Sequence, residues 1–157
     1  ALKLGSLTLR GGIKAPTGDA AKLTGSGAMD LSLGVHGGGT MTFLDRDLAF
    51  SGFVGVLALG DGDVMPGLQR STVPYGGAAL RWHATPRFAL STQLYVQGPY
   101  FDTNLDELGG SPIQLAFGGD YVFPRQRLLL RIAIAEDIAA GAAPDFALHI
   151  SIRRYGH

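Results

Sequence analysis

Two side chains near the end of the sequence have the types and the spacing of a nucleophile and its base. His149 and Ser151 are two residues apart, and on a β-strand such positions lie on the same face, where they could touch. A serine nucleophile also needs an acid that orients the histidine. No acid follows Ser151 in the sequence, although a distant Asp120 or Asp30 could supply it in space. We therefore predict that no residue of this chain is catalytic.

A second group of candidates consists of ionisable residues that alternate with apolar ones. If their faces enclose an interior, each charge there must be paired or reach water. Basic residues outnumber acidic ones in this group, so a wet interior would favour anions, whereas a narrow one would be closed by salt bridges. We favour the second interpretation. The candidates are Arg10, Lys14, Asp30, His36, Arg81, His83, Asp120, Arg131, His149 and Arg153.

The sequence gives little sign of a metal or cofactor site. Acidic residues occur in two predicted loops, which could offer hard oxygen ligands to calcium, but neither loop has the spacing of a twelve-residue calcium loop. Cysteine is absent, and the three candidate histidines lie on separate predicted strands. We expect no metal and no cofactor, and solvated turn acids in the loops: Asp61, Asp63, Asp102, Asp106 and Glu107.

All of these candidates depend on β-strands to position them. Residues 29–43, MDLSLGVHGGGTMTF, place Met, Leu and Val at one set of alternate positions and mostly small or polar residues at the other. A strand sends successive side chains to opposite faces, so this stretch predicts a strand with one apolar and one polar face. The same pattern recurs, more weakly in 48–60, and predicts about eight strands at 7–15, 29–43, 48–60, 75–84, 88–97, 113–123, 127–135 and 145–155.

The predicted connections alternate between long and short. This arrangement is typical of an outer-membrane β-barrel, which has short turns at one end and longer loops at the other. Aromatic residues at the strand ends lie beside the short turns, where such barrels carry an interfacial girdle: Phe43, Trp82, Phe88, Phe123 and Tyr155. We therefore predict an all-β protein, an antiparallel up-and-down transmembrane barrel of about eight strands, in one domain over residues 1–157 or as part of a larger barrel.

The low fraction of charged residues indicates that a medium other than water covers part of the protein surface. Charged residues make up 17% of the 157 residues, with three lysines and two glutamates, and the net charge is zero. A soluble domain usually carries about 25–35% of such residues on its surface, and no apolar run is long enough for a transmembrane helix. The alternative is a soluble, lipocalin-like ligand-binding barrel with its apolar residues inside. Neutral charge gives no sign of a nucleic-acid partner.

Several short motifs carry a resemblance to a known family. The run K-x-PTGD at 14–19, LTGSG at 23–27 and Asp30 at the start of the next strand resemble a family of uncharacterised Gram-negative envelope proteins. The resemblance implies an outer-membrane barrel and assigns no catalytic residue. Members are about twice this length, so the chain corresponds to a carboxyl-terminal half, and we expect it to be a fragment.

These observations favour a non-enzymatic outer-membrane protein that serves as a structural component or a passive conduit. We expect it in the bacterial outer membrane, in contact with lipid or lipopolysaccharide, with the barrel-insertion machinery, and with a missing barrel half or another envelope protein. A small lipid-modifying enzyme is the other alternative, because lipid A deacylases are small barrels with a His-x-Ser arrangement. Their usual continuation after the serine is absent here.

Overall fold

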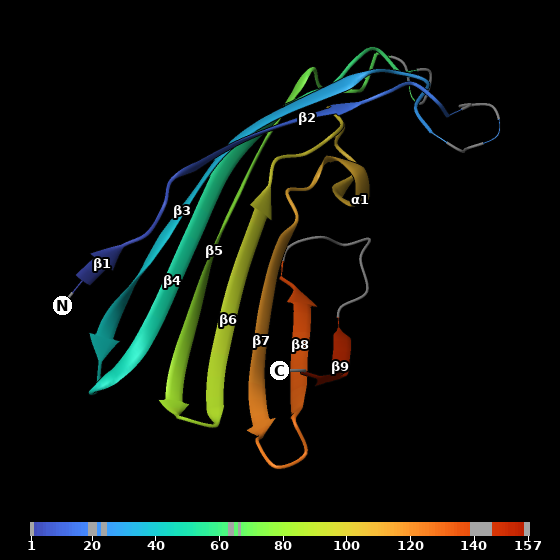
Figure 1. Ribbon diagram of the computed structural model, residues 1–157. Coiled ribbons are helices and arrows are strands. Elements are labelled where there is room, and N and C mark those ends of the chain that lie inside the picture. Colours follow the sequence, from blue (N-terminus) through green and yellow to red (C-terminus); the bar gives the residue numbers. More distant parts are fainter. Residues whose placement is uncertain are drawn as a thin grey trace.

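The strands form a single antiparallel sheet. The computed structural model describes residues 2–18, 22, 25–62, 65, 67–138 and 146–155. In this part of the chain one short helix, α1 (Asp106–Gly109), accompanies nine strands (Figure 1). The strands are β1 (Leu2–Leu4), β2 (Thr8–Lys14), β3 (Asp30–Phe43), β4 (Arg46–Ala58), β5 (Thr72–Thr85), β6 (Phe88–Gln97), β7 (Ile113–Phe123), β8 (Leu128–Asp137) and β9 (Ala147–Arg154).

The nine strands occupy eight positions in the sheet. From β3 to β9 each strand pairs with the next one along the chain, while β1 and β2 both pair with β3, at different parts of its length. The predicted strand pattern is therefore confirmed: 88–97 and 113–123 agree in full. The structure extends the strand predicted at 75–84 to Thr72 at one end and Thr85 at the other, and adds β1, which is too short to give an alternating pattern.

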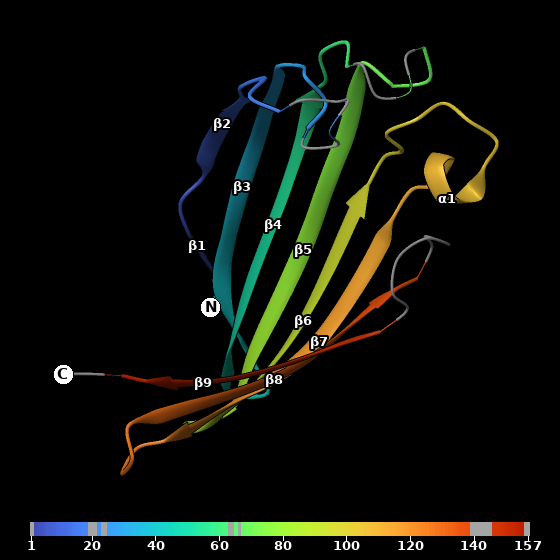
Figure 2. The same cartoon turned by 90° about the vertical axis from the view of Figure 1, so that its right-hand side faces the viewer.

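The connections alternate in length as the sequence predicts. Turns of two to four residues join β3 to β4, β5 to β6 and β7 to β8, and all three lie at the same end of the sheet (Figure 1). In the β3–β4 turn Leu44 and Asp45 both have positive φ, at 50° and 56°, which is the geometry of a two-residue type I′ hairpin. The longer connections and α1 lie at the opposite end (Figure 2).

Two of the long connections associate with each other. The backbone N–H of Arg70 donates to the carbonyl of Tyr100 at 2.9 Å, and that of Asp102 donates to the carbonyl of Leu68 at 2.7 Å. An exposed ion pair between Arg70 and Asp102, with an N–O distance of 3.0 Å, adds to this contact. The β4–β5 and β6–β7 connections therefore form one pair beyond the ends of their strands.

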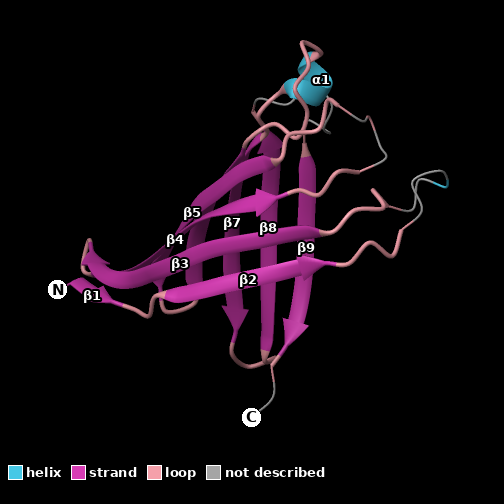
Figure 3. Cartoon of the chain, turned by 90° about the horizontal axis from the view of Figure 1, so that it is seen from above, coloured by secondary structure: helices cyan, strands magenta, loops and turns pink. Residues whose placement is uncertain are grey.

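The sheet is curved but open, which corrects the prediction of a closed barrel. Among the described residues β9 pairs only with β8, and neither β1 nor β2 has a partner other than β3. Seen from above, the edge strands β2 and β9 cross at a wide angle and do not run side by side (Figure 3). Closure depends on strand tilt and on the stagger between strands, and the alternation of residue types specifies neither of them.

One face of the sheet is apolar and exposed. Large apolar side chains on every strand are exposed, with 67% for Val54 and 69% for Ile152. Only Ala28, Val73 and Ala89 are buried apolar residues in the described chain, so the sheet has no packed core of large side chains. The pairing register places the following residues on this side, which we call the apolar face: Leu9, Leu33, Val54, Leu80, Leu94, Phe117, Ile132 and Ile150.

Aromatic residues form a row on the apolar face beside the short turns. Phe43 and Trp82 lie edge to face, with ring centroids 6.2 Å apart, and the indole N–H of Trp82 donates to the carbonyl of Phe43 at 3.3 Å. Tyr121 and Phe123 pack at 4.7 Å. The backbone N–H of Tyr155 bonds the β7–β8 turn at Arg127. The predicted position of the aromatic residues, beside the short turns, is confirmed.

The opposite face, which we call the polar face, holds aromatic side chains over glycines. A Cβ at Gly34 would lie 2.8 Å from the hydroxyl oxygen of Tyr75, and one at Gly55 would overlap the tyrosine ring. Phe53 lies between His36, Tyr75 and Tyr95, with ring centroids 5.0, 6.2 and 6.2 Å away. A larger residue at Gly34 or Gly55 would therefore collide with the Tyr75 side chain.

Replacing Gly55 by valine is expected to lower the free energy of unfolding by about 1–3 kcal/mol, the usual cost of overpacking. The new side chain would collide with the Tyr75 ring and would place its Cβ 2.7 Å from the carbonyl oxygen of Leu33. Chemical denaturation followed by circular dichroism measures the change. Gly11→Val is the matched control, because a Cβ at Gly11 has no neighbour closer than 3.8 Å. Equal losses in the two variants would contradict this packing.

Among the described residues, no helix has the length and the apolar character needed to cross a membrane.

Candidate functional site

A cluster of three charged residues lies on the polar face. Asp120 of β7 is 2% exposed and accepts hydrogen bonds from Arg81 of β5 and Arg131 of β8. The Nε of Arg131 donates to Oδ1 of Asp120 at 2.6 Å and its Nη2 donates to Oδ2 at 3.0 Å, while Arg81 donates to Oδ2 through Nη1. Charge-assisted, bidentate bonds of this kind are the stronger class of hydrogen bond, so the cluster connects three strands, β5, β7 and β8, and its Arg81 side chain crosses β6.

Each member of the cluster reaches it by a different route. Asp120 and Arg131 are direct partners across the β7–β8 hairpin. Arg81 belongs to β5, so its side chain must cross β6 to reach β7. The β6 residues at this level are Ser91, the partner of Arg81, and Ala89, the partner of Asp120. Both are small, and this leaves space for the long arginine side chain to pass.

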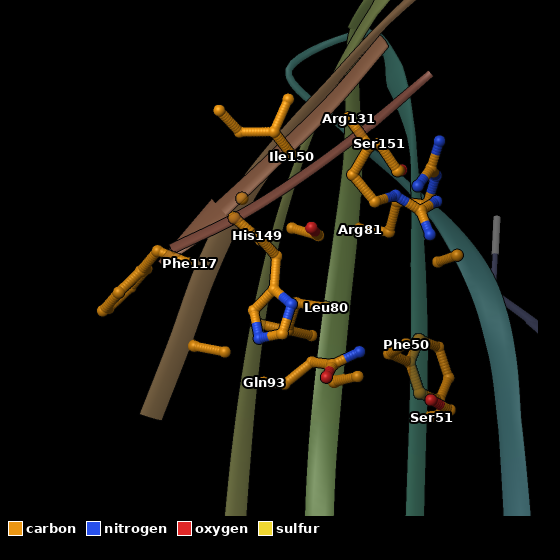
Figure 4. Close-up of a pocket in the computed structure, with 16 residues that line it drawn as sticks. Phe50, Ser51, Leu80, Arg81, Gln93, Phe117, Arg131, His149, Ile150 and Ser151 are labelled. Atoms are coloured by element: carbon orange, nitrogen blue, oxygen red, sulfur yellow. The ribbon is translucent and has the colours of Figure 1, made fainter. Parts of the chain in front are cut away.

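The cluster stands at the side of a hollow of about 630 Å³ on the polar face. Polar side chains from five strands line it, and Figure 4 shows the two guanidinium groups on one side and the imidazole of His149 on the other, in this view beside Gln93. The polar side chains of the lining are Ser51, Arg81, Ser91, Gln93, Arg131, His149 and Ser151.

The structure brings some of the predicted residues together and leaves others apart. Asp30 begins β3, at the loop end, where its carboxylate bonds Lys14 at 2.6 Å and accepts a hydrogen bond from the backbone N–H of Gly60 at 3.2 Å. It therefore secures the loop end of β2, β3 and β4. His36, near the middle of β3, stacks on Phe53, with ring planes 16° apart.

The other predicted residues do not join the charge cluster. The register places Arg10, opposite Gly34, and Arg153, opposite Leu129, on the polar face. His83 lies in the irregular part of β5 between Trp82 and Thr85, where the register shifts. The prediction that these side chains face a lumen stays a prediction, since the sheet is open.

His149 and Ser151 share the polar face and line the same hollow. Within the described part of the chain no hydrogen bond joins them, and the acid nearest in register, Asp120, is already bonded by two arginines. Ser151 is the direct partner of Arg131, and His149 is opposite Ala133. Among the residues that the structure describes, this arrangement offers no acid that would orient the histidine as a base.

Reasoning from the sequence missed three hollow-lining residues, Ser51, Ser91 and Gln93. Each is the polar member of an alternating strand, so the pattern could have placed them on the correct face. Only the pairing register between strands, however, brings Ser91 level with Arg81 and places Ser51 and Gln93 level with Ala79, two residues away on β5.

The described residues contain no group of three or more His, Cys, Asp or Glu residues that could hold a metal ion. Of the acids predicted in loops, Asp102 pairs with Arg70. Asp63 lies outside the described residues, as do the side chains of Asp106 and Glu107.

The fold defines the class of protein: an all-β protein with a single antiparallel sheet that is apolar on one face and polar on the other. Residues 3–156 match the family described as "Protein of unknown function (DUF3187)", and the chain therefore belongs to that family. The prediction of an uncharacterised family is confirmed. No curated protein and no solved structure shows significant similarity to the chain.

The substitution Asp120→Asn is expected to lower the free energy of unfolding by about 2–3 kcal/mol, because hydrogen bonds to a charged acceptor contribute roughly 1.5–3 kcal/mol. It would also leave two guanidinium groups close together without a counterion. Denaturant titration of the refolded protein measures this change. Asp102→Asn is the control: its pair with Arg70 is exposed, at 81% for the Asp102 side chain, and exposed pairs contribute little. A smaller effect at Asp120 than at Asp102 would show that the cluster is not structurally important.

Proposed function

We propose that this chain forms the wall of an outer-membrane β-barrel of the structural or passive-conduit type, without catalysis. The observation that carries the proposal is the apolar face, which extends over every strand and is left uncovered by any layer of the described structure. Soluble monomers rarely expose a continuous apolar patch of more than a few hundred Å². Lipid is the medium in which such a face has no cost.

The strand lengths suit a membrane. Among the strands that are not at an edge of the sheet, β6 and β8 are the shortest, with ten residues each. The longest, β3 and β5, have fourteen residues each. A tilted strand of about 9–11 residues crosses the hydrocarbon core. The aromatic row beside the short turns has the position of an interfacial girdle, and the long connections at the other end correspond to outer loops.

The two alternatives receive less support. A soluble lipocalin-like barrel keeps its apolar residues inside, whereas here the large apolar side chains on the strands are exposed and the hollow side carries the polar ones. A lipid-modifying enzyme needs a positioned base, and among the described residues the acid nearest in register to His149 and Ser151, Asp120, is bonded to two arginines instead.

The proposal sets a requirement for the two edges of the sheet, because unpaired backbone groups are not tolerated in lipid. The described strands occupy eight positions, an even number, so β2 and β9 run antiparallel to each other. Either these edges close on each other within the membrane, or further strands of another chain or segment pair with both. The apolar face would then contact lipid or lipopolysaccharide, and insertion would depend on the barrel-insertion machinery of a Gram-negative outer membrane.

Heat-modifiable gel mobility of the detergent-refolded chain tests the proposal. We expect the unboiled protein to migrate as a compact band that shifts on boiling, because a closed, detergent-embedded barrel resists unfolding until it is heated. The protein should also aggregate when detergent is removed. A chain that stays monomeric in buffer without detergent, with native circular dichroism, would overturn the proposal.

A charge introduced on the apolar face should prevent insertion into lipid. For Val54→Lys we expect a loss of about 2–4 kcal/mol in folding free energy in lipid vesicles, the usual cost of lysine at the bilayer midplane. Ser51→Lys is the matched control: Ser51 is also exposed and lies on the same strand, but on the polar face. Folding yield in vesicles, measured by the gel shift, compares the two variants. Equal tolerance of both lysines would contradict a lipid-facing role for Val54.

A further inference from the structure

The exposed charge of the hollow on the polar face is positive. Its lining contains Arg81, Arg131 and His149, and no carboxylate of the described residues is among the lining side chains. Asp120, the one acid among the described residues that bonds these arginines, is only 2% exposed. A solute that enters the hollow therefore meets the two guanidinium groups and not their counterion.

The two guanidinium groups keep donors that Asp120 does not use. Each guanidinium has five N–H groups. Arg131 gives Asp120 one bond from Nε and one from Nη2, and Arg81 gives one from Nη1. For the remaining N–H groups of either arginine, no acceptor occurs among the residues that the structure describes. The cluster carries one positive charge in excess, and the Arg131 side chain is 53% exposed.

The buried carboxylate also orients the donors. Asp120 holds Arg131 side-on and fixes the Nη of Arg81 from the other side, so little conformational entropy is lost when a ligand binds them. Neutral hydroxyl and amide groups surround the pair, with Ser91 and Ser151 as the direct strand partners of Arg81 and Arg131. Such a set of a planar guanidinium fork and neutral donors suits the oxygens of a phosphate.

We propose that this hollow binds a small, soluble oxyanion of the phosphate type through Arg81 and Arg131. Asp120 acts as a positioning residue. The ligand is soluble and not a lipid headgroup, because the hollow opens on the polar face, opposite to the side that carries the apolar residues. The inference does not depend on which medium covers the apolar face, so it can fail or hold independently of the membrane proposal.

Isothermal titration calorimetry with inorganic pyrophosphate tests the site on the whole chain, in detergent or in buffer, whichever keeps it monodisperse. We expect pyrophosphate to bind the unmodified protein saturably. The polycation spermidine, titrated in the same way, should not bind. Arg81→Gln and Arg131→Gln should each weaken pyrophosphate binding about tenfold, which corresponds to about 1.4 kcal/mol for a lost charge-assisted contact. Arg154→Gln is the matched control, since Arg154 lies on β9 but on the apolar side.

A second variant keeps the test independent of folding defects. Ser91→Asp places a carboxylate in the hollow directly opposite Arg81 while Asp120 and both arginines remain. We expect it to fold, as judged by circular dichroism, and to bind pyrophosphate at least tenfold more weakly. Absence of binding by the unmodified protein, an equal loss in Arg154→Gln, or unchanged affinity in Ser91→Asp would each overturn the proposal.

Discussion

The backbone hydrogen-bond ladder of one antiparallel sheet holds this molecule together, because the described residues form no second layer against which the strands could pack. Large apolar side chains such as Val54 and Ile152 are exposed, and the few buried apolar residues are small or medium in size. In water, such a sheet would combine a satisfied backbone with an unfavourable apolar surface. The environment of the apolar face therefore decides whether the structure is stable, and this is why the proposed function begins from that face.

Stability beyond the ladder comes mainly from the polar face. Three kinds of contact cross between strands there: aromatic rings that lie over glycines at Tyr75 and Phe53, the Asp30 carboxylate that secures the loop end, and the Asp120 cluster near the short turns. These contacts are spread along the length of the sheet. The cluster at Asp120 has two consequences at once, since the acid that connects β5, β7 and β8 also presents two arginines to the hollow.

Reasoning from single residues predicted the faces better than the contacts. Asp120 and Arg131 are each three residues from the ends of a short hairpin turn, so their pairing follows from the turn alone. Arg81 is separated from Asp120 by a whole strand, and no local signal connects the two. His36 was predicted as an ionisable side chain of a polar interior, but in the structure it stacks on the aromatic ring of Phe53. The residue type and its position in the alternating pattern predicted the face of the sheet on which His36 lies, but they did not predict which side chain it contacts.

The sequence by itself determined the alternation of apolar and polar residues, the position of the turns and, from these, an antiparallel sheet with short turns at one end. It did so because a strand has a period of two residues and turns have strong local preferences. The tertiary structure decided how far the sheet curves, that β9 and β2 do not meet, and which side chains from β5, β7 and β8 come together. These properties depend on tilt, stagger and register over many strands, and none of them is recorded in the residue types of any one strand.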